Sequence, residues 1–84
     1  MKKILITVHI LNIGEDFDIF IPIDMKVLNV ISLIQKSISD MDQIEYIPKK
    51  KEDVILIDSA GKAINSNNIV KFSGLKNGSR VVLI

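Results

Sequence analysis

The chain has 84 residues, which is enough for one small domain with a modest core. Its 11 Lys and Arg residues nearly balance its 10 Asp and Glu residues, and the formal net charge of +1 argues against a dedicated nucleic-acid-binding protein. Cysteine is absent, so disulfides, thiolate catalysis and Cys-based metal sites are excluded. No apolar run approaches the roughly 20 residues of a membrane span, and we expect a cytoplasmic protein with no stable membrane insertion.

The first two predicted elements are strands. Residues 3–11 alternate, and their even-numbered side chains form a fully apolar face. Residues 12–16 are predicted to form a turn, in which Gly14 can take a positive φ. Residues 17–21 alternate again as far as Pro22, which cannot donate to a sheet ladder. Two alternating runs joined by a short Gly-containing loop predict a β-hairpin.

The stretch from Asp24 to Asp40 predicts the one long helix, at about residues 25–39. Its apolar residues recur at helical spacing and form a single stripe, made of Val27, Val30, Ile31, Ile34 and Ile38. We expect Asp24 to be the N-cap, because its carboxylate can accept hydrogen bonds from the free amides of the first turn. The stripe needs a sheet to cover it, and the rest of the chain must supply that sheet.

The part of the chain after the helix is predicted to contain short elements. Residues 41–47 fit either a helical turn or an extended link, and residues 49–53 form a charged loop. Residues 54–57 predict a short apolar strand. A turn is predicted at residues 58–62, and a very short strand at 63–64 follows it. Capping residues at 65–68 then precede a helical turn at 69–72. The last predicted elements are a turn at 77–78 and a strand at 80–84.

The order of these elements predicts an α+β fold of the β-grasp type. In that fold a mixed sheet of four to five strands packs on one main helix, here within a single domain spanning residues 1–84. We expect the first and last strands to lie parallel at the centre of the sheet, because both are among the most hydrophobic stretches. A ferredoxin-like domain is the alternative, but it requires a second helix of useful length.

The pattern resembles the ubiquitin-like superfamily over nearly the whole chain. Residues 54–57, the turn at 60–62 and Ile64 are similar to the third strand, turn and short fourth strand of a ubiquitin-like domain. Residues 69–84, with an Asn-Gly turn before the last strand, are similar to its closing segment. Within the superfamily the chain is most similar to the small bacterial YukD/EsaB group, on the character of helix residues 27–34.

This resemblance implies a non-enzymatic, cytoplasmic protein-interaction module without a cofactor. Its role would be that of an accessory or regulatory component of a type VII (ESX-like) secretion system, with protein partners. The alternative is a sulfur carrier or a conjugated ubiquitin-like protein. Such proteins need a flexible tail ending in Gly-Gly, and this sequence ends in Leu83-Ile84 within a predicted strand, so we disfavour that alternative.

We predict no catalytic, metal-binding or cofactor-binding residues. His9 is the only histidine, and no carboxylate lies at a sequence spacing that suggests a triad, so we interpret it as a structural or surface residue. Lys49, Lys50 and Lys51 could contact phosphate, nucleic acid or anionic lipid, but acidic residues follow at once and favour a solvated loop.

Leu5, Val82 and Ile84 are the candidate protein-interaction residues. If the alternate residues on either side of them face the helix, these three face away from it, because strand side chains alternate. An apolar patch on the open face of the sheet would bind a protein partner, or a second copy of the chain in a homodimer. The alternative interpretation is an ordinary, partly exposed sheet surface.

Overall fold

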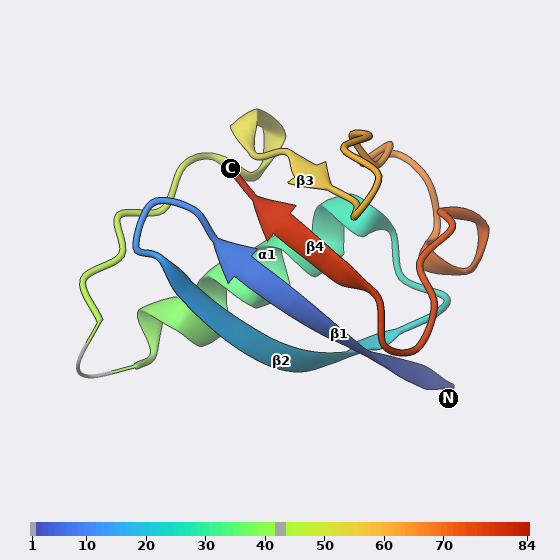
Figure 1. Ribbon diagram of the computed structural model, residues 1–84, viewed down its shortest axis with the longest axis horizontal. Coiled ribbons are helices and arrows are strands. Elements are labelled where there is room, and N and C mark those ends of the chain that lie inside the picture. The colour runs from blue at the N-terminus through green and yellow to red at the C-terminus, as the bar shows by residue number, and fades with distance from the viewer. Residues whose placement is uncertain (1, 42–43) are drawn as a thin grey trace.

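The computed structural model describes residues 2–41 and 44–84. The regular elements of this part of the chain are β1 (Lys3–Ile10), β2 (Glu15–Pro22), α1 (Val27–Ser39), the 3₁₀ helix η1 (Lys51–Asp53), β3 (Leu56–Ile57), the 3₁₀ helix η2 (Val70–Phe72) and β4 (Arg80–Leu83). The strands form one sheet in the order β2-β1-β4-β3, and α1 crosses behind it (Figure 1). As predicted, β1 and β4 are parallel at the centre, and the β-grasp arrangement is confirmed.

The core lies between the sheet and α1. All five residues of the predicted helical stripe are buried there. The strands contribute their inward-facing residues, which include Ile6, Val8, Ile10, Ile21, Leu56, Val81 and Leu83. Burying each of these side chains contributes roughly 1.5–3 kcal/mol, so the packing of one helix on one sheet accounts for most of the stability.

The start of α1 differs from the prediction, because Asp24 is not its N-cap. The helix begins at Val27 without a side-chain cap. Instead, the amide N–H of Val27 donates to the Asn68 carbonyl oxygen over 2.9 Å. The next amide, that of Leu28, donates to the Ser66 carbonyl oxygen over 2.9 Å. The main chain that precedes η2 therefore satisfies the free amides that a side chain was expected to satisfy.

The β1–β2 turn is shorter than predicted. It occupies residues 11–14, and Glu15 and Asp16, which were predicted to be turn residues, are the first residues of β2. Both are in the strand because the antiparallel register runs to the end of β1 and places Asp16 opposite His9. The extra pairs bring an acidic side chain next to the imidazole.

The segment between α1 and β3 contains little regular structure. Part of the ambiguous prediction for residues 41–47 falls on residues 42–43, which lie outside the described residues. Residues 44–50 form an irregular link without a helical turn. The loop predicted at residues 49–53 contains η1 over its last three residues, so it is not wholly irregular.

The strands after η1 are shorter than predicted. β3 covers only two of the residues 54–57, although Ile55 and Ile84 exchange two main-chain hydrogen bonds of 3.1 and 3.0 Å beyond its end. The predicted strand at residues 63–64 is reduced to a single bridge between Ala63 and Ile57. The sheet therefore has four strands within the described part of the chain.

Candidate protein-interaction surface

The face of the sheet opposite α1 is open, and the strand register fixes which side chains meet on it. Leu5 of β1 lies opposite Phe20 of β2. His9 lies between Asp16 of β2 and Val82 of β4. Side chains on one face of a sheet contact their cross-strand neighbours, so the face is divided into chemically distinct rows.

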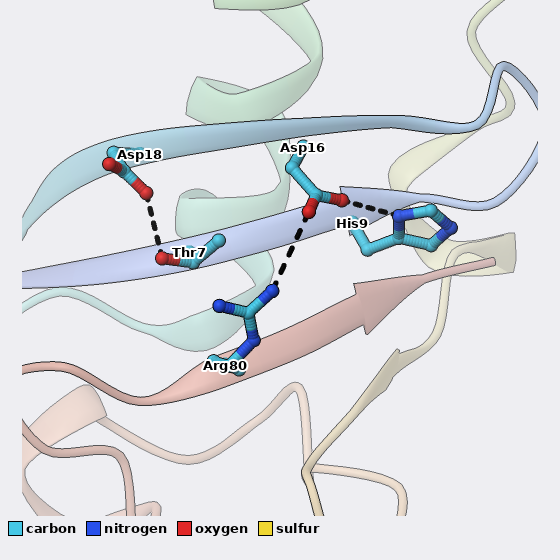
Figure 2. A network of polar contacts seen from close by, with 5 residues as sticks. All are labelled: Thr7, His9, Asp16, Asp18 and Arg80. Carbon is cyan, nitrogen blue, oxygen red and sulfur yellow. Dashed lines mark hydrogen bonds and ion pairs between the residues drawn. The ribbon is translucent and has the colours of Figure 1, made fainter.

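The middle rows form a polar network of Thr7, His9, Asp16, Asp18 and Arg80 (Figure 2). His9 Nδ1 lies 2.5 Å from one carboxylate oxygen of Asp16, and an Arg80 guanidinium nitrogen lies 3.5 Å from the other. Thr7 Oγ1 donates to the Asp18 carboxylate over 2.7 Å. All of these groups are at least partly exposed, so the network is worth little as a source of stability.

The partner of His9 could not be found from sequence spacing alone. Asp16 is seven residues away in the chain and reaches His9 only through the hairpin register. A carboxylate orients the imidazole of a catalytic histidine in the same way, but a triad also needs a nucleophile. Among the hydrogen bonds of the described residues, no hydroxyl group contacts His9. The geometry fits the interpretation of His9 as a surface residue.

A depression of ≈ 270 Å³ lies beside this network. Four residues of the polar network, two apolar residues of β4 and two residues of the turn after β3 line it, namely Thr7, His9, Asp16, Arg80, Val81, Val82, Asp58 and Ser59. The Asp58 carboxylate accepts from the amides of Ala60 and Lys62, each over 2.9 Å, so it is occupied in holding that turn. Within the described residues, no three His, Asp or Glu side chains gather as a metal site would require.

An apolar corner occupies the β3–β4 side of the open face, and we define it as Ile55, Ile57, Val82 and Ile84. Val82 is the cross-strand neighbour of Ile57, and Ile84 is hydrogen-bonded to Ile55 through the main chain. Ile55 keeps 48% of its surface exposed, and the other three are half-buried. Ile55 was not among the predicted site residues, although the alternation of residues 54–57 could have placed it on this face.

The structure brings together two of the three predicted interaction residues. Val82 and Ile84 belong to the apolar corner, whereas Leu5 lies on the other side of the polar network, beside Phe20. The Leu5 amide donates to the Asn77 side-chain oxygen over 2.8 Å, which ties the predicted turn to β1. Phe20, which is 61% exposed, is a second apolar residue that the predicted site omitted.

Several solved structures that resemble this chain are ubiquitin-like. A Caldiarchaeum subterraneum ubiquitin matches with a TM-score of 0.74 and 15% identity, over 99% of this chain and 92% of that one. The ubiquitin-like domain of a Plasmodium falciparum protein matches with a TM-score of 0.68 and 19% identity, over 99% and 100%. A structure described by the words "Molecular Mimicry of SUMO promotes DNA repair" matches with a TM-score of 0.78 and 19% identity, over 100% and 92%.

The fold is a ubiquitin-like β-grasp. No protein-family model and no curated protein matches the sequence. In the part of the chain that the structure describes, no helix is long and apolar enough to cross a bilayer.

Proposed function

We propose that this ubiquitin-like chain is an interaction module that binds a protein partner through the apolar corner. The observation that carries the proposal is the contiguity of four Ile and Val side chains on a face that no described segment covers. Val82 lies in β4 between β1 and β3, and Ile84 exchanges two main-chain hydrogen bonds with Ile55, so binding would order little of the protein. A rigid apolar surface with a polar rim is the usual anatomy of a binding site for another protein.

The polar network supplies the rim on one side of this corner. Asp16, His9 and Arg80 are exposed enough to meet a partner's polar groups at the edge of the contact. A partner that covers the whole open face would also contact Leu5 and Phe20. Val82 and Ile84, two of the three residues predicted from the sequence, thus belong to the proposed site, and Leu5 lies outside it beside Phe20.

The resemblance to the YukD/EsaB group supports a more specific role. We propose a cytoplasmic accessory or regulatory component of a type VII (ESX-like) secretion system, whose partner is a protein of that system. The sequence feature that supports this role is the character of helix residues 27–34. The role would be supported if the gene lay next to genes for small secreted helical-hairpin proteins and for an FtsK-like ATPase.

The proposal is tested by co-purification of the chain with the FtsK-like ATPase of a type VII system. Val82→Glu should abolish co-purification, and Leu5→Asp should weaken it less, because Leu5 lies outside the apolar corner. Ile47→Glu is the matched control, since Ile47 is 88% exposed on the link after α1. Co-purification that survives Val82→Glu in a folded protein, as judged by its NMR spectrum, would rule out the apolar corner as the site.

A further inference from the structure

The turn that precedes β4 is attached to the start of β1 (Figure 1). It comprises residues 76–79, and the Ser79 amide donates to the Lys76 carbonyl oxygen over 3.0 Å. Gly78, at the third position, has a φ of 89°. No described residue other than glycine has a positive φ, so Asn77 at the second position keeps a negative one. This combination is a type II β-turn, in which only the third residue needs the left-handed region.

Leu5 of β1 holds both groups of the Asn77–Gly78 pair. Its amide donates to the Asn77 side-chain oxygen over 2.8 Å. Its carbonyl oxygen accepts from the Gly78 amide over 2.7 Å. Leu5 reaches the turn because odd-numbered residues of β1 direct their main-chain groups toward β4, as the bond from the Thr7 amide to the Ser79 carbonyl oxygen shows.

The same alternation assigns the main-chain groups of the β1–β2 hairpin. Ile6 and Val8 direct theirs toward Ile19 and Phe17 of β2, so the residues between these pairs have no bond across the hairpin. Leu5 lies opposite Phe20 in a pair of this second kind. In the described part of the chain, the N–H and C=O groups of Leu5 therefore bond to the turn alone.

An asparagine that precedes glycine is chemically labile, because glycine has no side chain that hinders cyclisation. After losing its proton to base, the glycine nitrogen attacks the asparagine side-chain carbonyl carbon. A C–N bond forms, the bond to the side-chain nitrogen breaks, and that nitrogen takes up a proton and leaves as ammonia. Water then opens the cyclic imide to aspartate or to isoaspartate, in which the chain runs through the side-chain carbons. Asn77 is the only asparagine of the sequence that precedes a glycine.

The folded structure restrains both groups that must react. The Gly78 N–H, whose proton has to be lost, is bonded to the Leu5 carbonyl oxygen. The Asn77 side-chain oxygen is bonded to the Leu5 amide, which fixes the direction of the carbonyl group. Asn77 and Gly78 are both exposed, so water and base reach the turn. The two bonds to Leu5, rather than burial, therefore limit the reaction.

We propose that Asn77 is a latent deamidation site, which the pairing with Leu5 keeps closed in the folded chain. The reaction begins when the turn separates from β1, because that separation frees the Gly78 amide and the Asn77 side chain together. Isoaspartate adds a carbon atom to the main chain of the turn, so this product cannot re-form both bonds with Leu5. The modification permanently weakens the attachment of β4 to β1, and it does not depend on the function proposed above.

The first test compares the folded chain with the same chain unfolded in guanidinium chloride, at one mildly alkaline pH. Mass spectrometry of proteolytic peptides measures the loss of the Asn77 amide. We expect folding to slow this loss at least about tenfold, because the reaction requires an opening that is rare in the folded state. Equal rates in the two states would overturn the proposal.

The second test asks whether deamidation and hydrogen exchange share one opening. Ile6→Ala leaves the turn and Leu5 unchanged but removes packing from the centre of the core, so the turn should open more often. The protection of the Gly78 amide from exchange and the resistance of Asn77 to deamidation should then fall by the same factor. A fall in one without the other would overturn the proposal. Guanidinium chloride below the unfolding midpoint makes the same comparison with the unsubstituted chain, so the test survives a variant that fails to fold.

The third test examines the product after refolding. The isoaspartate form should lose the protection of the Leu5 amide and unfold at a lower denaturant concentration. Asn77→Asp is the matched control, because it has the same atoms and charge as the isoaspartate form on an unaltered main chain. Its carboxylate oxygen can accept from the Leu5 amide, so this protection should persist. Equal loss in the two forms would show that the charge breaks the pairing, and would overturn the assigned role of the main chain.

Discussion

Gln35 is the one buried polar side chain of the described core, and its contacts explain how the link after α1 is held. It is 8% exposed in the middle of the helix. Its side-chain nitrogen donates to the Tyr46 hydroxyl over 3.2 Å and to the Lys49 carbonyl oxygen over 3.0 Å. A buried amide that satisfies two groups of an irregular segment anchors that segment to the helix.

Replacing the donor at this position with an acceptor should loosen the link. Gln35→Glu turns a carboxylate oxygen toward the Lys49 carbonyl oxygen and should lower the free energy of unfolding by about 2 kcal/mol. Tyr46→Phe removes only one acceptor and should lower the free energy of unfolding by about 1 kcal/mol or less. Urea denaturation measures both, and an equal cost for the two variants would contradict the role assigned to Gln35.

At the scale of single residues, what the sequence revealed was the direction of strand side chains. The outward orientation of Leu5, Val82 and Ile84 was predicted from alternation; Val82 lies between the buried Val81 and Leu83, and Leu5 precedes the fully buried Ile6. The contacts of Gln35 and the pairing of His9 with Asp16 were not predicted. Both depend on segments that are separate in the sequence and lie close together only in the fold. Sequence spacing contains no information about which segments will lie close together.

At the scale of elements, β2 combines a bonded side and a free side along the same strand. The rate of amide hydrogen exchange should therefore alternate between slow and fast from one residue of β2 to the next. Phe17 and Ile19 should exchange slowly, and Asp18 and Phe20 should exchange near the rate of an unstructured chain. Exchange monitored by NMR in the absence of any partner checks this, and uniform protection along the strand would contradict the derived orientation.

The start of α1 allows a test of how a helix is capped. Asp24 lies before the helix and makes a 3.2 Å ion pair with Lys71, both side chains being largely exposed. Asp24→Ala should lower the free energy of unfolding by about 0.5 kcal/mol or less, as expected of a surface pair. Loss of a true N-cap would cost about 1 kcal/mol or more. Thermal or urea unfolding distinguishes the two values.

Long periodic elements were predicted better than their ends. The helical stripe at residues 27–38 and the alternation of β1 specify one element each, because the apolar period decides between helix and strand. The cap at Asp24 was wrong because carbonyl groups of residues 66–68 satisfy the first turn. A local sequence rule cannot include acceptors supplied from forty residues away along the chain.

At the scale of the whole molecule, one apolar layer holds the sheet to the helix. Ile6 is fully buried at its centre, and Ile6→Ala should lower the free energy of unfolding by about 2–5 kcal/mol through lost burial and a residual cavity. Ile47→Ala removes the same atoms from an exposed site and should change it by about 0.5 kcal/mol or less. Chemical denaturation compares the two, and similar losses would contradict the assigned core.

The global arrangement was predicted because two strongly apolar stretches lie at opposite ends of the sequence. Strands buried by neighbours on both sides are the most hydrophobic, which placed residues 3–11 and 80–84 at the centre. The division of the open face into an apolar corner, a polar network and a Leu5–Phe20 pair was beyond prediction. It follows from the parallel register of Thr7 with Arg80, which pattern alone does not determine.

The parallel pairing of β1 with β4 has a consequence for synthesis on the ribosome. β1 cannot form its parallel pairing until β4 has been synthesised, so the two central strands of the sheet pair only after the chain is made through Leu83. Until then the nascent chain exposes the apolar faces of the β1–β2 hairpin and α1, and exposed apolar surface of this kind promotes aggregation. Emergence of β4 from the ribosome, rather than emergence of the helix, therefore completes the sheet.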